Sequence, residues 1–477
     1  MAHHHASVGF DPGVLIADPS RRGQILSILE AALRAVNPGE ALRRSLRRQG
    51  NDLIANDTRY SLGRFQRVFV IGFGKAAAPM GQAAAEILGE WLTSGLLVTK
   101  VGHGGTHARL PQAVTLLESA HPIPDAAGVA AAQRIADLAR QATADDLVLC
   151  LISGGGSALL TLPAEGLTLA DLQATTAALL RCGASIDEIN TLRKHLSQVA
   201  GGQLAKLATP ATLLSLVLSD VVGSPLDVIA SGPTVPDRSS WADAWDVVER
   251  RGLQAALPDQ VLEHLRAGLA GQIADTPKAS DAAFALTQTL VIGDNAIAAQ
   301  AAQQRATELG FNARVLTTFL EGEAREVAKV AVAFGREVVA HGRPVAAPAC
   351  LILGGETTVT LRGQGTGGRN QELALAAALT LDRLPEKQRI VVVSLATDGT
   401  DGPTNSAGGL VDGTTVGRGS AIGIDAATHL ADNNSNPYLE AVDDLLVTGP
   451  TQTNVNDLVF VFVWPENVGQ IANSPRP

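Results

Sequence analysis

Short apolar runs that end in glycine recur along the chain, and each is followed by a stretch of helical character. The run RVFVIGFGK over Arg67–Lys75 leads into an alanine-rich stretch, and LVLCLISGGGS over Leu147–Ser157 repeats the arrangement. Two later runs, Leu290–Asn295 and Leu351–Glu356, have the same form. Runs of this length predict buried strands, and strands that alternate with helices predict a mainly parallel sheet. The pattern therefore predicts an α/β fold.

Two other segments carry different patterns. Residues 20–50 have apolar side chains at helical spacing and are predicted to form a helix, with a break at Asn37–Gly39. The stretch from Ser219 to Asp237 is rich in Gly and Pro and is predicted to be a long ordered loop, a feature that is often functional.

The chain of 477 residues is longer than one hydrophobic core usually supports, so two domains are expected. Residues 271–281 have linker composition, and we place the boundary there. This gives an N-terminal α/β domain over 20–270 and a C-terminal α/β domain over 285–465. Residues 1–10, which contain three successive histidines, are expected to be a tag remnant or a flexible N-terminus.

The net charge of −10 leaves no basic surface for nucleic acid and no polybasic segment for lipid. No run reaches the roughly 18 apolar residues of a membrane span. Cys150 and Cys350 lie inside apolar runs, where a thiol acts as a small core residue, and the odd count of three cysteines suits a reducing cytoplasm. We expect a cytoplasmic protein that acts on a small molecule.

The segment GFGKAA, Gly72–Ala77, satisfies the G-x-G-x-x-G/A pattern of dinucleotide sites. Such a site also needs an acidic residue at the end of the next strand, but that strand ends in Lys100. Lys75 stands at the start of a predicted helix, where a cation is unfavourable unless an anion also binds. We therefore favour phosphate or carboxylate binding at Lys75 over a solvated lysine.

Two further glycine-rich loops are candidate phosphate sites. Three glycines between Ser153 and Ser157 let backbone N–H groups converge on an anion, whereas a simple turn needs only one. The loop GQGTGG leads to Arg369 at another helix start, where its planar fork suits a carboxylate or phosphate, and a pair with Glu372 is the alternative. The residues predicted to bind the nucleotide are Ser153, Gly154, Gly155, Gly156, Ser157, Gly367 and Gly368.

Acidic residues follow two of the predicted strands. Asp220 ends an apolar run and opens the long loop, a position typical of a general base or metal ligand. Asp398 and Asp401 follow the strand Val391–Leu395. They either hold Mg²⁺ or a substrate hydroxyl, or belong to ordinary Asp-Gly turns.

Basic residues gather in one helical turn at Arg193, Lys194 and His195, which is either a solvated face or an anion-facing end. His121 and His195 are candidate bases, although a lone histidine is more often structural. The spacing of Cys and His matches no zinc site.

Taken in order, the motifs resemble one family. GFGKAA, ESAHPIPD, LISGGGSALL, INTLRKHLS, LSDVVGSPLDVIASGPT, LILGGETTVTLRGQGTGGRNQELAL, ATDGTDGPT and NVNDL closely resemble the glycerate 2-kinase family, whose members have often been labelled hydroxypyruvate reductases. The resemblance runs from about Ile25 to Val463. By motif, the family's active-site lysine, aspartate and arginine correspond to Lys75, Asp220 and Arg369.

The resemblance implies two α/β domains, the first Rossmann-like with a mainly parallel sheet, and an active site in the interdomain cleft. It also implies transfer of the terminal phosphoryl group of ATP to the 2-hydroxyl of D-glycerate, with Mg²⁺. We expect Arg193, Lys194 and Asn370 to contact the substrate and Asp398 or Asp401 to help hold Mg²⁺. The protein is expected to be a monomer or homodimer.

Two rival functions are an NAD(P)H-dependent hydroxypyruvate reductase and a sugar-acid sensor without turnover. The reductase is favoured by GFGKAA, but Lys100 and the lack of a clear histidine–carboxylate pair count against it.

Overall fold

The computed structural model describes residue 10, residues 19–104 and residues 109–466. The predicted tag remnant at residues 1–10 lies outside the described residues, apart from Phe10. Within the described part of the chain, no helix is both long and apolar enough to cross a membrane.

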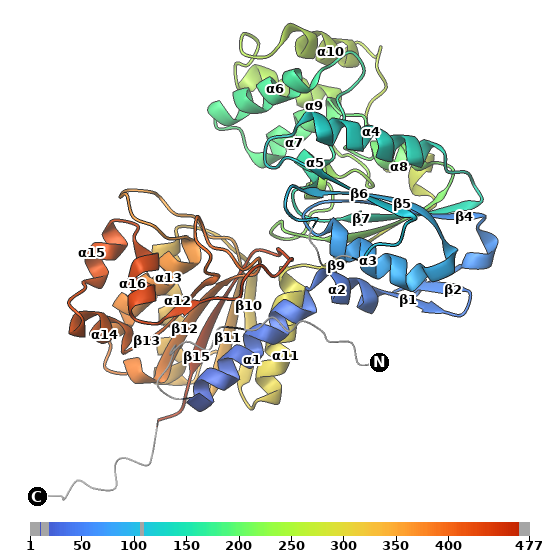
Figure 1. Cartoon of the computed structure of the whole chain (residues 1–477). Coiled ribbons are helices and arrows are strands. Elements are labelled where there is room, and N and C mark those ends of the chain that lie inside the picture. Colours follow the sequence, from blue (N-terminus) through green and yellow to red (C-terminus); the bar gives the residue numbers. More distant parts are fainter. Residues whose placement is uncertain (1–9, 11–18, 105–108, 467–477) are drawn as a thin grey trace, which may run out of the picture. The chain divides into compact units, whose positions relative to one another are not determined.

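The chain divides into two compact units (Figure 1). Unit 2 comprises residues 38–293, and unit 1 comprises residues 294–477 with residues 1–37. Each unit has one six-stranded sheet, and unit 2 also has a small three-stranded sheet. The predicted α/β class is confirmed.

All neighbouring strands of the large sheet in unit 2 run parallel, in the order β6-β5-β4-β7-β8-β9. Counted along the unit from β4, this order is third, second, first, fourth, fifth, sixth, the doubly wound order of Rossmann folds. The Rossmann-like first domain is thus confirmed. The strands are β4 (Arg67–Phe73), β5 (Leu92–Lys100), β6 (Val114–Ser119), β7 (Asp146–Ile152), β8 (Thr212–Leu218) and β9 (Thr287–Gly293).

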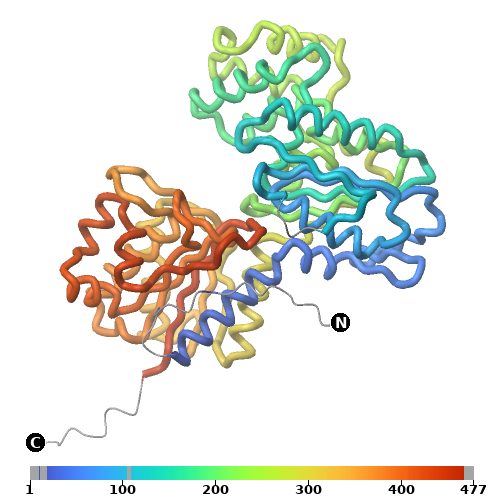
Figure 2. Tube along the Cα trace, in the orientation of Figure 1, coloured from blue at the N-terminus to red at the C-terminus, as the bar shows by residue number. Residues whose placement is uncertain are grey.

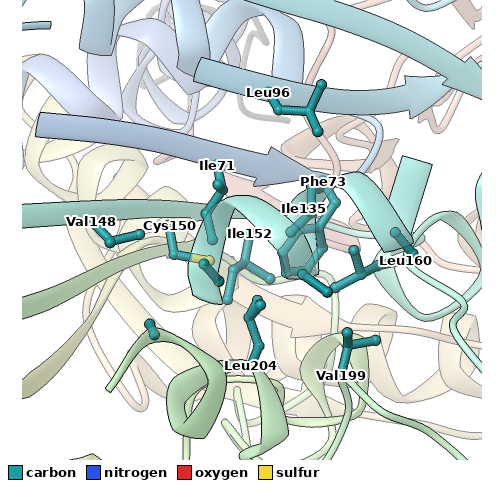
Figure 3. Close-up of a cluster of buried hydrophobic side chains, with 14 of the residues drawn as sticks. Ile71, Phe73, Leu96, Ile135, Val148, Cys150, Ile152, Leu160, Val199 and Leu204 are labelled. Carbon is teal, nitrogen blue, oxygen red and sulfur yellow. The ribbon is translucent and has the colours of Figure 1, made fainter. Parts of the chain in front are cut away.

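The central strands of this sheet are buried along their whole apolar runs, because helices cover both faces of a parallel sheet. Figure 3 shows one face, where Phe73 of β4 and Ile152 of β7 meet Ile135 and Leu204 from the covering helices. Cys150 is buried in the same cluster. Full burial of each large apolar side chain contributes about 1.5–3 kcal/mol. Ile135 belongs to α4 (Ala126–Arg140) and Leu204 to α8 (Gln203–Ala208). The other helices of this part of unit 2 are α2 (Pro38–Ser45), α3 (Ala77–Leu88) and α5 (Gly156–Leu159).

Four further helices of unit 2 form a separate group with a core of its own (Figure 1). The ring of Trp241 lies between those of His195 and His264, with centroid distances of 4.6 and 5.4 Å. Capping boxes start three of the helices, each with a hydroxyl from Thr168, Ser185 or Ser240 at the N-cap. The helices are α6 (Leu169–Arg181), α7 (Ile186–His195), α9 (Trp241–Arg250) and α10 (Asp259–Leu269).

The sheet of unit 1 has the order β10-β11-β15-β12-β13-β14 and is mixed. Only β10 and β11 run parallel, because β15, from the end of the described chain, enters between β11 and β12 antiparallel to both. The mainly parallel arrangement therefore holds for unit 2 and not for this sheet. The strands are β10 (Asn312–Leu320), β11 (Ala349–Gly355), β12 (Ile390–Ala396), β13 (Gly408–Asp412), β14 (Leu445–Leu446) and β15 (Asp457–Val463).

The first helix, α1 (Pro19–Ala35), belongs to unit 1 and packs along α11 (Asn295–Glu308), as Figure 2 shows. Its side chains at Ile25, Ile28 and Leu29 are fully buried, and Arg305 Nε donates to Ser27 Oγ at 2.9 Å. The other helices of unit 1 are α12 (Ala324–His341), α13 (Arg369–Asp382), α14 (Thr415–Ala421), α15 (Ala426–Ala431) and α16 (Ser435–Ala441).

The division between the units differs from the predicted ranges 20–270 and 285–465. The linker-like residues 271–281 lie inside unit 2, because β9, which follows them, pairs in parallel with β8 and completes the first sheet. Residues 20–37 join unit 1 because the apolar face of α1 is buried there.

The helix predicted over residues 20–50 is interrupted at the expected break and ends earlier than predicted. After α2, the chain forms the small antiparallel sheet of β1 (Leu46–Gln49), β2 (Asp52–Ala55) and β3 (Thr58–Ser61). In β2, buried residues alternate with partly exposed ones, which is the period of a strand and not of a helix. The prediction of a helix was therefore wrong at this end.

Candidate functional site

The loops after β4 and β7 meet where the strand order of the unit 2 sheet reverses. In doubly wound sheets, ligands bind outside the carboxyl ends of the strands at this switch point. The first loop carries Lys75, whose backbone N–H donates to the carbonyl of Gly154 at 2.9 Å. The N–H of Ala76 donates to Ser153 Oγ at 3.0 Å. The fold therefore joins two of the predicted glycine-rich segments at the place where the sheet predicts a ligand.

Two of the glycines after β7 leave room for functional side chains. A Cβ at Gly154 would stand 2.0 Å from Oδ2 of Asp220, which follows β8. A Cβ at Gly155, where φ is +81°, would stand 3.0 Å from Cδ2 of His121 and 3.5 Å from Cγ of Lys75. Lys75, Asp220 and His121 thus converge on one short stretch of backbone in unit 2.

A pocket of about 320 Å³ adjoins this stretch. Asp220, His121 and Ser157 belong to its wall, and Arg193 lines it from α7. Most of the remaining wall is apolar, and it includes Leu160, Leu172, Leu179, Ile189, Leu196 and Val199. The pocket combines a few convergent polar groups with an apolar lining, which is the usual character of a small-molecule site.

Arg193 has no carboxylate within ion-pairing distance among the residues that the structure describes. Its Nη1 donates to Asn190 Oδ1 at 3.2 Å, and the same oxygen accepts from Ser231 Oγ at 3.0 Å. Ser231 Oγ lies 2.9 Å from Ser157 Oγ. Burial lowers the pKa of Arg193, since the guanidinium is partly removed from water without a counter-charge. An anionic ligand in the pocket would supply that counter-charge.

The long loop after β8 is ordered and irregular, as predicted, and it forms one side of the pocket. Ala230 and Ser231 have φ values of +50° and +60°, in the left-handed region that non-glycine residues rarely adopt. Such backbone strain often marks ligand sites, and here it places the Ser231 hydroxyl beside Asn190.

Lys194 and His195 point away from this pocket and take part in a buried network. Lys194 Nζ lies 3.1 Å from Oδ1 of Asp237, and both side chains are nearly inaccessible. His195 Nε2 lies 3.0 Å from Asp275 Oδ1, and its Nδ1 lies 2.8 Å from the carbonyl oxygen of Thr191. The structure therefore gives Lys194 a structural ion pair rather than a place at the predicted substrate site, and only Arg193 of this turn lines the pocket.

Arg369 begins α13 in unit 1 and is held by two carboxylates. Its Nε and Nη2 donate to Asp457 at 2.5 and 3.1 Å, and its Nη1 donates to Glu356 at 2.6 Å. Burial raises the pKa of Asp457 to about 6, and Arg369 acts in the opposite direction. The pair with Glu372 that the sequence left open does not form, because Glu372 pairs with Arg325 at 2.8 Å.

Asp401 caps the start of α13. Its carboxylate accepts from the backbone N–H groups of Asn370 and Gln371 at 3.2 and 2.9 Å, and from both their side-chain amides. Asn370 is buried, and its Oδ1 accepts from Ser394 Oγ at 2.6 Å. A carboxylate at a helix N-terminus is favourable. These contacts hold Asn370 at the start of α13, and its contact with the substrate stays a prediction.

The predicted metal ligands do not form a metal site within unit 1. Asp398 accepts from the backbone N–H of Thr400 at 3.0 Å in a turn, while Asp401 is occupied as the helix cap. Across the described ranges, no three His, Cys, Asp or Glu side chains are grouped to hold a metal ion. This donor set does not fit a preformed Mg²⁺ site.

The glycines before Arg369 are explained by close packing inside unit 1. A Cβ at Gly367 would stand 2.2 Å from Ser435 Oγ, and one at Gly368 would stand 2.3 Å from Cγ of Asp401. The high glycine content of this loop therefore lets the chain approach its own neighbours, so it is not by itself a sign of a phosphate site.

Several residues of these sites were not singled out from the sequence. Asn190 and Ser231 shape the pocket wall, and Glu356 and Asp457 bind Arg369. A polar residue directly after or at the start of a buried strand is the signal that could have found the two acids, since Glu356 follows β11 and Asp457 begins β15.

The fold and the site define a two-unit α/β protein whose Rossmann-type sheet carries glycine loops, a lysine and an aspartate at its switch point. Residues 24–266 match the family model described as a domain of unknown function, DUF4147, and residues 349–457 match the MOFRL family.

The named relatives are similar in sequence to this chain along nearly its whole length. A D-glycerate 2-kinase of Thermotoga maritima is 41% identical over 435 residues, covering 91% of this chain and 96% of the relative. A glycerate kinase of Homo sapiens is 37% identical over 497 residues, covering 93% of each. A crystal structure of a glycerate kinase from Thermotoga maritima has a TM-score of 0.83 and 40% identity, covering 94% of this chain and all of that one. The chain belongs to the glycerate kinase family, as its motifs predicted.

Proposed function

We propose that the protein transfers the terminal phosphoryl group of ATP to the 2-hydroxyl of D-glycerate and releases 2-phosphoglycerate and ADP. The observation that carries this proposal is the convergence of Lys75 and Asp220 on the glycine loop beside the pocket that Arg193 lines. The family supports the reaction class, and two relatives are named for the 2-kinase activity. A carboxylate and a guanidinium in one pocket, with a lysine on the adjoining glycine loop, match the needs of phosphoryl transfer, which depends on positioning and charge neutralisation.

Each side chain has a role that its surroundings support. Asp220 orients the 2-hydroxyl of glycerate and accepts its proton as the oxygen attacks phosphorus. Arg193, which has no carboxylate partner among the described residues, binds the glycerate carboxylate. Lys75 neutralises charge that develops on the transferred group, and the backbone and hydroxyls of Ser153–Ser157 bind phosphate.

Arg369 is the third residue that the family motifs assign to the active site, and its catalytic role stays a prediction. Its ion pairs with Glu356 and Asp457 hold the guanidinium in a fixed orientation. Mg²⁺ arriving with the nucleotide would neutralise phosphate charge. Since Asp398 and Asp401 do not form a site for it, we assign it no protein ligand.

A reductase is the second candidate, because a relative from Agrobacterium vitis, 40% identical over 399 residues, carries a provisional hydroxypyruvate reductase name. The end of β5 counts against it. A dinucleotide site needs an acidic residue there to bind the ribose, and the strand ends in Lys100.

One pair of assays tests the proposal. ADP release is followed with D-glycerate, and nicotinamide absorbance is followed with hydroxypyruvate and NADH or NADPH. We expect ADP release without nicotinamide oxidation, and a product that enolase converts without a mutase. Oxidation of NAD(P)H without ADP release, or 3-phosphoglycerate as the main product, would contradict the proposal.

A further inference from the structure

Four basic side chains surround the carboxyl ends of β4, β5 and β6 in unit 2. Lys75 follows β4, Lys100 ends β5, His103 lies three residues beyond it, and His121 follows β6. Backbone contacts hold these segments together. Thr99 Oγ1 donates to the carbonyl of Lys75 at 3.3 Å, and the N–H of Val101 donates to the carbonyl of Ser119 at 3.0 Å.

The two histidines lie beside the lysines. The backbone N–H of His103 donates to the carbonyl of Lys100 at 2.8 Å. The ring of His121 lies over Gly155, beside the side chain of Lys75. We call Lys75, Lys100, His103 and His121 the basic cluster.

The charge of the basic cluster is poorly compensated. Neither lysine ammonium forms an ion pair with any residue in the described part of the chain. Two carboxylates lie near the cluster. Asp220 adjoins Gly154 on the side of Lys75 and His121. Glu118 of β6 lies on the side of His103, and its Oε1 accepts from the backbone N–H groups of Gly102 and Gly104 at 3.2 and 3.0 Å.

The pKa values of the two histidines are lowered, in part by this positive charge. Burial, followed by the charges of Lys75, Lys100 and His103, lowers the pKa of His121 to about 4. Burial, followed by Lys100 and Lys75, also lowers the pKa of His103, which Glu118 opposes. A multiply charged anion bound here would act in the opposite direction on both pKa values, because a nearby negative charge favours the protonated imidazole.

The position of the cluster restricts the kind of anion. Asp220 follows β8, and β4 and β7 lie between β5 and β8 in the sheet. Three strand spacings separate Lys100 from Asp220 across the sheet, about 14 Å in all. Lys100 and Asp220 therefore follow strands on opposite sides of Lys75. An anion that contacts Lys75 and extends away from Asp220 is directed toward Lys100.

We propose that Lys100 and His103 form a subsite for the polyphosphate chain of a nucleoside triphosphate, on the side of Lys75 away from Asp220. His121, which lines the acid pocket and lies beside Lys75, stands between this subsite and the acid. The inference rests on the proposed function, in which Lys75 contacts the transferred phosphoryl group. The donor then extends from Lys75 toward β5, and the acceptor acid occupies the pocket of Arg193. The position of Lys100 argues against a dinucleotide site, and in this proposal its ammonium binds a phosphate group.

Binding of inorganic tripolyphosphate and of ADP, measured by titration calorimetry, tests the subsite without turnover. We expect Lys100→Gln and His103→Gln each to weaken binding of both ligands by on the order of tenfold, because each removes one charge-assisted contact. Lys100→Arg keeps that contact and should bind as the wild type does. Lys206→Gln, which removes an exposed lysine of the same unit, is the matched control and should bind as the wild type does.

Steady-state kinetics supply the second arm. In Lys100→Gln, KM for ATP should rise while KM for glycerate stays unchanged. Unaltered affinity for tripolyphosphate and ADP in both glutamine variants would overturn the inference, as would a selective loss of 2-phosphoglycerate or glycerate binding, which would assign the cluster to the acid. A wild-type protein that binds tripolyphosphate through Lys100 but releases no ADP with glycerate would retain the subsite and reject the proposed function.

Discussion

The carboxylate of Asp220 lies against the backbone of Gly154, so close that a Cβ on that glycine would stand 2.0 Å from Oδ2. This contact joins the end of β8 to the loop after β7 and fixes where a proton acceptor stands relative to the phosphate-binding backbone. Gly154→Ala should therefore disturb Asp220 directly. We expect a loss of kcat of at least about a hundredfold, because misplacement by about 1 Å costs this much.

The control for Gly154 is Gly63→Ala, since a Cβ at Gly63 meets no atom within 4 Å. That variant should keep the activity and melting temperature of the wild type. A Gly154→Ala protein with normal kcat would show that Asp220 can move away without consequence, and the proposed base would be rejected.

Lys75→Ala should abolish turnover and leave the protein folded. Lys75 forms no ion pair with a described residue, and a cation beside a helix N-terminus contributes little to stability. Circular dichroism and the melting temperature should match those of the wild type, while ADP release falls to background. Near-normal ADP release from the folded variant would remove Lys75 from the mechanism.

Arg193 and Lys194 are neighbours in sequence and should respond in opposite ways to substitution. Arg193→Gln should raise KM for glycerate with little change in melting temperature, since it removes a guanidinium that lines the pocket without a carboxylate partner.

Lys194→Met should instead destabilise unit 2 by about 3–5 kcal/mol, because it leaves Asp237 as an unpaired buried charge. Urea unfolding and glycerate titrations of both variants check this pair. A rise in KM confined to the Lys194 variant would reverse the assignment.

Arg369→Lys should lower the stability of unit 1, because an ammonium cannot replace both bonds that the guanidinium makes to Asp457. Hydrogen bonds to charged groups contribute about 1.5–3 kcal/mol, and the loss should lie in this range. Asp457→Asn is the matched partner variant. If Arg369 also contacts the reacting groups, Arg369→Lys will lower kcat beyond Asp457→Asn, whereas equal kcat values would make the residue structural.

Asp444 should make the stability of unit 1 fall as the pH rises. It is fully buried, and burial raises its pKa to about 7 although Arg418 lies 2.7 Å away. In the unfolded chain this carboxyl releases its proton near about pH 3.9, so the folded state holds more protons between the two values. The contribution of Asp444 to the free energy of unfolding is therefore full below about pH 4 and is lost as the pH approaches about 7.

Asp444→Asn cannot titrate and should lack this dependence. The melting temperature of the wild type minus that of the variant should therefore decrease from about pH 4 to about pH 7. A difference that stays constant across this range would show that the folded carboxyl is ionised throughout.

The sequence by itself determined β4 and β7 at the centre of the first sheet, the glycine loops after them and the family. Apolar runs such as Arg67–Phe73 and Asp146–Ile152 are buried on both faces, and such runs are visible without tertiary information. The same is true of Lys75 and Asp220, which stand directly beyond strand ends and so must reach the edge of the sheet where ligands bind.

Only the tertiary structure decided which polar residues are already paired. Lys194 and Arg193 look alike in sequence, yet the helix turns one toward buried Asp237 and the other toward the pocket. The glycines at 367 and 368 resemble a phosphate loop but pack against Ser435 and Asp401. Strand direction in unit 1 and the partner of α1 were also beyond the sequence, since an apolar run specifies burial and does not specify the element that buries it.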